Sequence, residues 1–381
     1  MIYLDYAATT PMSEESLAIF NQVSKSFFGN PSSLHDSGER ASQLLETCRE
    51  ELAGLLGCLS KGLFFTSGGS ESNILALTSL IDAHKVKGNH LITTLSEHSS
   101  IYNFFTHLEN GGFEVTYLPL DQHGQIRLED LRKAIRETTI LASIQHGNGE
   151  IGTIQPIESI GNLLHQHQIL FHCDAVQTFG KVPINVTASK IDSLSVSSHK
   201  LYGPKGVGAV YINPAVKWNP QLPNTTHESG LRPGTINVPG IASFVTSAKT
   251  ACDDRIVEYT RLIEIREALI EKLRKFPINV HVEGHPSELL PGILGLRIEG
   301  IEGQYIMLEC NRYGIAISTG SACQAGNQKP SRLMKALGRS DTEAKQFIRL
   351  SFGKHTTEQD IETTVDVLKK ITEKFHLKGG T

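Results

Sequence analysis

Long apolar runs are missing from this 381-residue sequence, and so is an excess of charge of one sign. No run approaches the roughly 20 residues of a membrane-spanning helix, and the opening MIYLDYAATTP lacks the basic and apolar regions of a secretion signal. The 36 basic residues are nearly balanced by 40 acidic ones, so the sequence lacks the excess of positive charge typical of proteins that bind nucleic acid or an anionic membrane surface. We therefore expect a cytoplasmic protein that binds a small polar or zwitterionic molecule.

Closely spaced cysteine pairs are missing as well. The sequence has no C-x-x-C pair, which argues against a zinc ribbon and against a disulfide framework. His165 and His167 point in different directions if they lie on a helix, so they do not predict a metal site. In a reducing compartment each thiol should be free. The six cysteines are Cys48, Cys58, Cys173, Cys252, Cys310 and Cys323.

Short apolar runs alternate with helix-length segments from about residue 60 to residue 212. This alternation predicts an α/β fold in which helices cover both faces of a mostly parallel sheet. The helical patterns include 70–84 and 157–167. The predicted strands are 63–66, 91–94, 113–118, 140–144, 169–173, 193–197 and 208–212.

The pattern changes after a Pro-, Asn-, Thr- and Gly-rich stretch, 213–239, which predicts a loop. A long helix is expected over 253–275, and an amphipathic helix closes the chain after a capping box at Thr357 and Asp360. Further strands are expected at 278–282, 293–298 and 348–352. We predict a large domain over 13–254 and a smaller α+β domain over 255–381, with residues 1–12 able to pack with either.

Lys200, in SVSSHKLYGPKG, directly follows a predicted strand. Open α/β sheets bind ligands at the carboxyl ends of their strands, so this lysine is placed for ligand contact, although a solvated surface lysine is the plain alternative. Asp174, in FHCDAVQ, follows another strand, where a turn or helix cap is the alternative, and Gln177 comes one helical turn later. Pyridoxal phosphate (PLP) requires such a lysine for a Schiff base and such a carboxylate for its pyridinium nitrogen.

Two further stretches follow predicted strands. In FFTSGGSESN, the helix entry at Gly69 and Ser70 offers backbone N–H groups and the positive end of a helix dipole, which suit a phosphate. An ordinary helix entry capped by Ser70 is the alternative. In LSEHSS, the imidazole of His98 could stack on a flat cofactor ring and transfer protons near neutral pH.

Cys323 has unusual neighbours in the stretch ISTGSACQAGN. Free cysteines usually behave as small buried hydrophobes, but the Gly and Ser residues around this one cannot wall it off from water. A role in chemistry explains such a thiol better than packing does.

Ten motifs follow one another over almost the whole chain: YLDYAATTP, FGNPSSLH, FTSGGSESN, SEHSS, GEIGTIQP, HCDAVQ, SSHKLYGPKG, LRPGT, STGSACQAG and IRLSFG. In this order they resemble PLP-dependent cysteine desulfurases of the NifS/IscS type, which are class V aminotransferases with an aspartate aminotransferase-like fold. The length of the loop 318–330 resembles the long-loop group. A selenocysteine lyase or another class V PLP enzyme is the close alternative, and a non-catalytic sulfur- or metal-handling scaffold is the distant one.

The resemblance implies a homodimer that takes sulfur from L-cysteine and releases L-alanine. It assigns the Schiff base and the removal of the α-proton to Lys200, the pyridinium contact to Asp174, and the contact with the phenolic oxygen to Gln177. The implied phosphate ligands are Gly69, Ser70, Ser197 and His199, together with Thr235 from the partner subunit.

The remaining implied roles concern the ring and the substrate. His98 stacks on the cofactor ring, Arg349 clamps the substrate carboxylate as a planar fork can, and Asn30 also lines the substrate site. Cys323, as a thiolate, attacks the substrate sulfur and keeps it as a persulfide. An acceptor protein, such as an iron–sulfur scaffold or an apo-enzyme, then receives the sulfur. No resident metal is expected, and contact between Cys323 and a partner's iron–sulfur cluster would be transient.

The sequence departs from the family pattern at HGNGEIG. Gly149 stands where an asparagine commonly approaches the phenolic oxygen of the cofactor, and the neighbouring Asn148 is the candidate replacement. Ser229 stands where an arginine is common.

Overall fold

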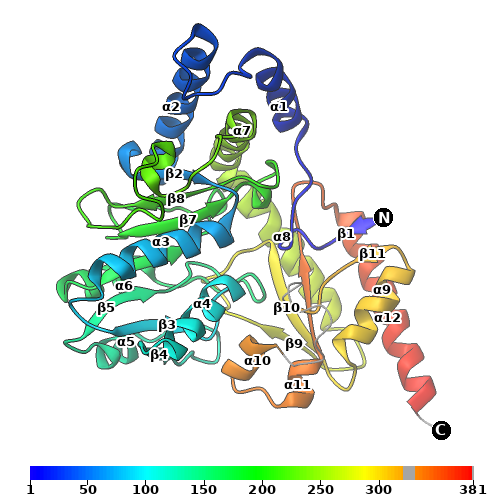
Figure 1. The fold of residues 1–381 in the computed structure, drawn as a ribbon. Coiled ribbons are helices and arrows are strands. Elements are labelled where there is room, and N and C mark those ends of the chain that lie inside the picture. Colours follow the sequence, from blue (N-terminus) through cyan, green and yellow to red (C-terminus); the bar gives the residue numbers. More distant parts are fainter. Residues whose placement is uncertain (321–330, 380–381) are drawn as a thin grey trace.

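A seven-stranded sheet forms the centre of the larger part of the molecule (Figure 1). The computed structural model describes residues 1–320 and 331–379, with side chains up to residue 375. The strand order is β2-β8-β7-β6-β5-β3-β4, and β8 runs antiparallel to both of its neighbours while the other pairs are parallel. The mostly parallel sheet is therefore confirmed. Its strands are β2 (Leu63–Thr66), β3 (His90–Thr94), β4 (Glu114–Leu118), β5 (Thr139–Ser143), β6 (Leu170–Asp174), β7 (Ser193–Ser197) and β8 (Gly208–Ile212).

Helices cover both faces of this sheet (Figure 1). Neighbouring residues of one strand point to opposite faces, so Phe64 packs into one apolar cluster and Phe65 into the other. The cluster around Phe64 includes residues of α3 (Gly69–His84) and α4 (Ser99–Asn110). The cluster around Phe65 includes residues of α2 (Asp36–Leu56), α5 (Leu128–Ala134), α6 (Ile157–Gln166) and α7 (Val238–Asp253).

The smaller part has a three-stranded antiparallel sheet of order β12-β10-β9. Thr357 and Asp360 bond reciprocally and cap the last helix, as predicted. The chain's first strand, β1 (Ile2–Tyr3), pairs with β11 (Ile315–Ala316), so the N-terminal residues join this part. The division into domains 13–254 and 255–381 stays a prediction. The other elements here are α8 (Arg255–Leu273), β9 (Val280–Glu283), β10 (Ile293–Ile298), α9 (Gly303–Arg312), β12 (Phe347–Ser351) and α12 (Glu358–Gly379).

One prediction about this region was wrong. The loop expected to reach residue 239 ends earlier, because α7 begins at Val238 with Asn237 as its N-cap, whose side chain accepts from the N–H of Gly240 at 3.0 Å. Pro239 fits the first turn of this helix, where proline needs no intrahelical partner, so it was misread as part of a loop. The helix expected over 253–275 is confirmed as α8, Arg255–Leu273. No counterpart of α1 (Glu14–Ser26) or α2 was predicted.

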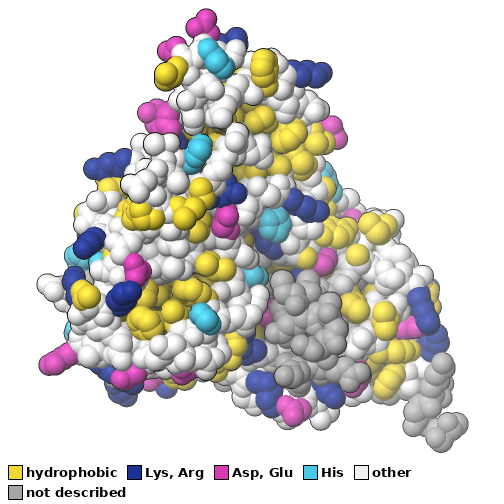
Figure 2. Space-filling view, viewed as in Figure 1, with side chains coloured by type: hydrophobic (Ala, Val, Ile, Leu, Met, Phe, Trp, Pro, Cys, Tyr) yellow, Lys and Arg dark blue, Asp and Glu magenta, His cyan; other side chains and the backbone are white. Residues whose placement is uncertain are grey.

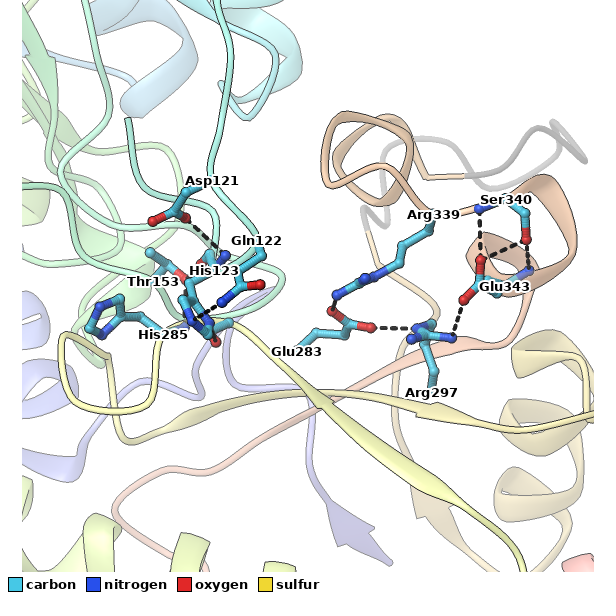
Figure 3. A network of polar contacts seen from close by, with 11 residues as sticks. Asp121, Gln122, His123, Thr153, Glu283, His285, Arg297, Arg339, Ser340 and Glu343 are labelled. Atoms are coloured by element: carbon cyan, nitrogen blue, oxygen red, sulfur yellow. Dashed lines mark hydrogen bonds and ion pairs between the residues drawn. The ribbon is translucent and has the colours of Figure 1, made fainter. Parts of the chain in front are cut away.

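A buried ion-pair network fastens α10 (Arg332–Ala336) and α11 (Asp341–Lys345) to the smaller sheet (Figure 3). The carboxylate of Glu283, on β9, is 1% exposed and pairs with Arg297 on β10 and with Arg339 at 2.8 Å. Arg297 also reaches Glu343 of α11 at 3.2 Å. The network fixes the segment that brings Arg332 to the cavity described below.

We predict that Glu283→Gln lowers the free energy of unfolding by about 3 kcal/mol, because the buried guanidinium of Arg297 loses the more buried of its two carboxylate partners. Urea unfolding followed by circular dichroism measures the change. Lys275→Gln, which breaks an exposed pair with Glu271, is the control and should change little. Equal stability of the two variants would contradict a structural role for the network.

Candidate active site

A cavity of about 310 Å³ lies where β3, β6 and β7 end. Because these strands are parallel, their carboxyl ends meet at one edge of the sheet, as the sequence predicted for ligand contact. Most of the predicted site residues line this cavity. They are Gly69, Ser70, His98, Asn148, Asp174, Gln177, Ser197, His199, Lys200 and Arg349.

Lys200 follows β7 in a single 3-10 turn and is 9% exposed. Its Nζ donates to the backbone oxygens of Ala7 at 2.5 Å and of Ala8 at 2.8 Å. Burial, together with the nearby positive charges of Lys181 and Arg349, lowers the pKa of Lys200 to about 7. A buried amine that is partly neutral at pH 7 can act as a nucleophile and carry a proton.

Asp174 is the last residue of β6, and its carboxylate is held by two donors. Its Oδ2 accepts from Nδ2 of Asn73 at 2.8 Å, and its Oδ1 accepts from the N–H of Val176 at 2.9 Å. Asn73 lies on α3 and is itself in contact with Nε2 of His172 at 3.1 Å. The sequence did not single out Asn73, although a polar residue on the buried face of a helix could have drawn attention to it.

His98 is the N-cap of α4, and its Nδ1 accepts from the N–H of Ser100 at 3.2 Å. Since a backbone N–H always donates, this contact requires the tautomer with its proton on Nε2. The ring is exposed to the cavity while protein surrounds it, and this partial desolvation lowers the pKa of His98. Ser100 Oγ also accepts from Asn73 at 3.1 Å, which connects the imidazole to the amide that holds Asp174.

The beginning of α3 offers an anion site. Its N-cap is Gly68, which has no side chain to cap the first turn, so Ser70 is not the cap and that alternative is wrong. Gly68 adopts φ 149°, which favours glycine, and a Cβ on Gly69 would lie 2.5 Å from Val176. Nearby, Ser197 Oγ is buried and has no hydrogen-bond partner among the described residues. Open N–H groups and an unpaired hydroxyl fit a ligand phosphate.

Gln177 lines the same cavity. Its Nε2 donates to the oxygen of Ala7 at 3.0 Å, while its Oε1 is buried without a partner within the described part of the chain. A Cβ on Gly149 would lie 3.0 Å from this Nε2, so glycine at position 149 leaves room for Gln177. Asn148 Oδ1 accepts from the N–H groups of Glu150 at 2.8 Å and Ile151 at 2.9 Å. Its amide is thus engaged with its own loop, and its contact with a cofactor stays a prediction.

Two guanidinium groups form a cationic wall. Arg349, on β12, is 4% exposed, and its Nη1 donates to the oxygen of Gly149 at 2.9 Å. Arg332 lies 3.7 Å from the ring centroid of Tyr102, and its Nε donates to the oxygen of Leu95 at 2.8 Å. The sequence did not indicate Arg332, because a lone arginine in an amphipathic segment looks like a surface residue. Such a wall suits a carboxylate.

Three predicted site residues do not line the cavity in this chain. Asn30, between α1 and α2, and Thr235, before α7, are both exposed. Cys323 lies in 321–330, outside the described residues. The roles of all three stay predictions.

The five described cysteines are free, and none of them lines the cavity. Burial raises the pKa of Cys48, Cys58 and Cys310 to about 12 and also raises that of Cys173 and Cys252. Because the thiolate is the nucleophile, these thiols are poorly suited to attack a substrate near neutral pH.

A larger cavity, of about 460 Å³, lies on the other side of Lys200. Ala7 and Lys200 line both cavities, and Tyr6, Leu201 and Phe352 give the larger one apolar walls. The residues with predicted chemistry gather in the smaller cavity, which is therefore the candidate active site.

The comparisons with known proteins agree with this geometry. A model of the aminotransferase class-V family matches residues 2–364. The chain belongs to the aminotransferase class-V family.

Within this family, the chain is similar to proteins named NifS and IscS. A NifS relative from Bacillus subtilis (strain 168) is 49% identical over 364 residues, covering 95% of this chain and 92% of its own. The cysteine desulfurase IscS of Dictyoglomus turgidum (strain DSM 6724 / Z-1310) is 40% identical over 374 residues, covering 98% of this chain and 95% of its own. A solved NifS-like protein superposes with a TM-score of 0.91 at 31% identity, covering 98% of this chain and 99% of its own.

The predicted family and fold class are therefore confirmed. Within residues 1–320 and 331–379, no helix is both long and apolar enough to cross a membrane. In the same part of this class V chain, no group of His, Cys, Asp and Glu side chains could hold a metal ion.

We predict that Lys200 reacts with a small amine reagent, such as acetic anhydride, with a midpoint near pH 7. Only the neutral amine reacts, and burial depresses the pKa, so the rate should rise as pH increases through this value. Competitive labelling of ligand-free protein followed by peptide mass spectrometry measures the midpoint, with exposed Lys87 as the internal reference. A midpoint for Lys200 near 10, the ordinary value for lysine, would contradict the assignment.

Proposed function

We propose that the protein is a PLP-dependent cysteine desulfurase that converts L-cysteine to L-alanine and keeps the sulfur as a persulfide on Cys323. One observation carries the proposal. The same cavity holds a buried lysine with a lowered pKa, an oriented aspartate and an uncapped helix N-terminus. The names of relatives such as the IscS protein support the substrate.

The residues of the cavity fit PLP. Lys200 would hold it covalently, and Asp174 would pair with its pyridinium nitrogen. The N–H groups at the start of α3 and the unpaired Ser197 Oγ would receive its phosphate, and His98 would lie against its ring. When bound, PLP supplies an electron sink for the substrate carbon.

The protein's own groups would then handle the substrate. Arg349 would bind its carboxylate from the cationic wall, which fixes the position of the α-carbon. Lys200, partly neutral near pH 7, would remove the α-proton. His98, with its proton on Nε2, would donate a hydrogen bond into the cavity.

The sulfur step needs a thiolate. Glu150, a wall residue, receives a hydrogen bond from Ser331 Oγ at 2.8 Å on its Oε2, and a Cβ on Gly320 would lie 3.0 Å from the same oxygen. Gly320 and Ser331, which border 321–330, thus both lie next to Glu150, a residue of the cavity wall. Cys323 follows Gly320 by three residues, a span of at most about 11 Å. Its thiolate would attack the substrate sulfur, so that an S–S bond forms, the C–S bond breaks and the carbon retains the electron pair until it is protonated to alanine.

A homodimer and a cytoplasmic location are part of the proposal. Asn30 and Thr235 are exposed and outside this chain's cavity, so we place them at the cavity of the partner subunit. Phe28 and Leu34, on the connection that also carries Asn30, are 75% and 104% exposed. Figure 2 shows apolar side chains gathered at this end of the molecule, which is typical of a contact surface. The persulfide would pass to an acceptor protein, such as an iron–sulfur scaffold or an apo-enzyme.

A selenocysteine lyase is the second candidate, because the same lysine and carboxylate would serve selenocysteine. The raised pKa values of the five described thiols favour neither substrate. A comparison of kcat/KM for L-cysteine and L-selenocysteine distinguishes the two candidates.

We predict that Cys323→Ala binds PLP and L-cysteine as the unaltered enzyme does but produces almost no alanine, because the covalent step is lost while binding is retained. Alanine formation and visible absorbance are measured on the same sample, and mass spectrometry seeks one added sulfur on the Cys323 peptide. Cys252→Ala, outside the cavity, is the matched control and should retain activity. Substantial turnover by Cys323→Ala, or a persulfide confined to another cysteine, would overturn the proposal.

A further inference from the structure

The guanidinium of Arg349 already has a carboxylate partner. Its Nη2 lies 2.6 Å from Oδ1 of Asp5, and the two side chains are 5% and 21% exposed. Asp5 belongs to the N-terminal stretch YLDYAATTP, more than 300 positions earlier in the sequence. The proposed function therefore requires a substrate carboxylate to bind an arginine that is already paired.

The two terminal nitrogens of Arg349 are both engaged. Nη2 donates to Asp5, and Nη1 donates to the backbone oxygen of Gly149 at 2.9 Å. Nε has no partner among the described residues, but it is buried and so cannot receive a ligand without a rearrangement. A carboxylate gains most from a guanidinium when it takes two neighbouring N–H groups at once. A substrate can obtain this arrangement at the cavity face by displacing Asp5.

Asp5 is the partner that can leave. The described residues show no other donor to its carboxylate, and the partial exposure of its side chain allows water to solvate it after release. Its backbone is anchored independently, because its oxygen accepts from Tyr3 at 3.1 Å and it bridges to Ser351. The oxygen of Gly149, in contrast, is part of the main chain and cannot swing away alone.

We propose that Asp5 is the resting counter-ion of Arg349 and that the substrate carboxylate displaces it, an inference that rests on the proposed function for the identity of the substrate. The exchange keeps the buried guanidinium paired at every stage, which avoids the cost of an isolated buried charge. It also makes entry selective, since a thiol without a carboxylate cannot replace Asp5. Asp5 is a positioning residue that tunes affinity and takes no part in bond making.

A fixed support is the competing role for Asp5. In that case the carboxylate would stay on Nη2 and hold Arg349 in place while the substrate binds elsewhere on it. The two roles predict opposite signs, because removing a competitor tightens substrate binding whereas removing a support weakens it.

The test uses Asp5→Asn in the holoenzyme. Loss of a partly exposed competing ion pair should lower KM for L-cysteine about threefold to fivefold and leave kcat within about twofold. Asp5→Ala should shift KM in the same direction, which excludes the explanation that the new asparagine amide itself contacts the substrate. Asp254→Asn, which breaks an exposed pair with Lys354, is the matched control and should leave both constants unchanged.

A second measurement separates this inference from the proposed function. Propionate, a carboxylate that cannot react, is titrated calorimetrically into PLP-free protein, and Asp5→Asn should bind it about threefold to fivefold more tightly. If desulfurase activity is absent but propionate still binds more tightly, the proposed function fails and the counter-ion role stands. Weaker or unchanged propionate binding, or a higher KM, would overturn the counter-ion role.

Discussion

The backbone of Ala7 connects the two sheets at the cavity. Its oxygen accepts from Nζ of Lys200 and from Nε2 of Gln177, both on the large sheet's side, and its N–H donates to Ser351 Oγ of β12 at 2.9 Å. Residues 7, 200 and 351 are far apart in the sequence, so these contacts require the whole chain to be folded. If this segment moved, the lysine, the amide and the adjacent arginine would lose their relative positions.

The burial of Lys200 beside this segment also determines the protonation of its amine. The surrounding protein disfavours the charged amine and brings its pKa to about 7, and the carbonyl groups of Ala7 and Ala8 receive its N–H bonds. In the same cavity, Asp174 keeps a defined orientation because Asn73 and Val176 both donate to it. PLP chemistry requires an amine that is partly neutral near pH 7 and a fixed carboxylate in one cavity.

The sequence predicted those parts of the site that follow strands. Lys200, Asp174 and His98 were predicted because an apolar run of strand length ends just before each of them, and parallel strands bring such ends together. Contacts made by main-chain atoms could not be predicted, since the oxygen of Ala7 has no signature in the sequence. Asp5 was part of a quoted motif, but its pairing with Arg349 depends on a contact across 344 positions.

The wrong predictions about helices also have physical causes. Composition indicated a loop up to residue 239, but Pro239 occupies the one part of a helix where proline is well tolerated, so α7 was missed. Ser70 looked like a cap because serine often is one, whereas the helix begins one residue before it, after Gly68. Residue preferences alone suggested both the loop and the serine cap. At the start of α3, the backbone of Gly68 and Gly69 lies close to Ser197 and Val176, and this close approach favours glycine there.

Each role proposed for the cavity depends on Lys200 holding the cofactor, and borohydride reduction shows whether it does. Purified protein is saturated with PLP, reduced with borohydride and digested, and the peptides are analysed by mass spectrometry. We expect one phosphopyridoxyl adduct, on the peptide that contains Lys200. An adduct on Lys181 instead, or protein that takes up no PLP, would contradict it.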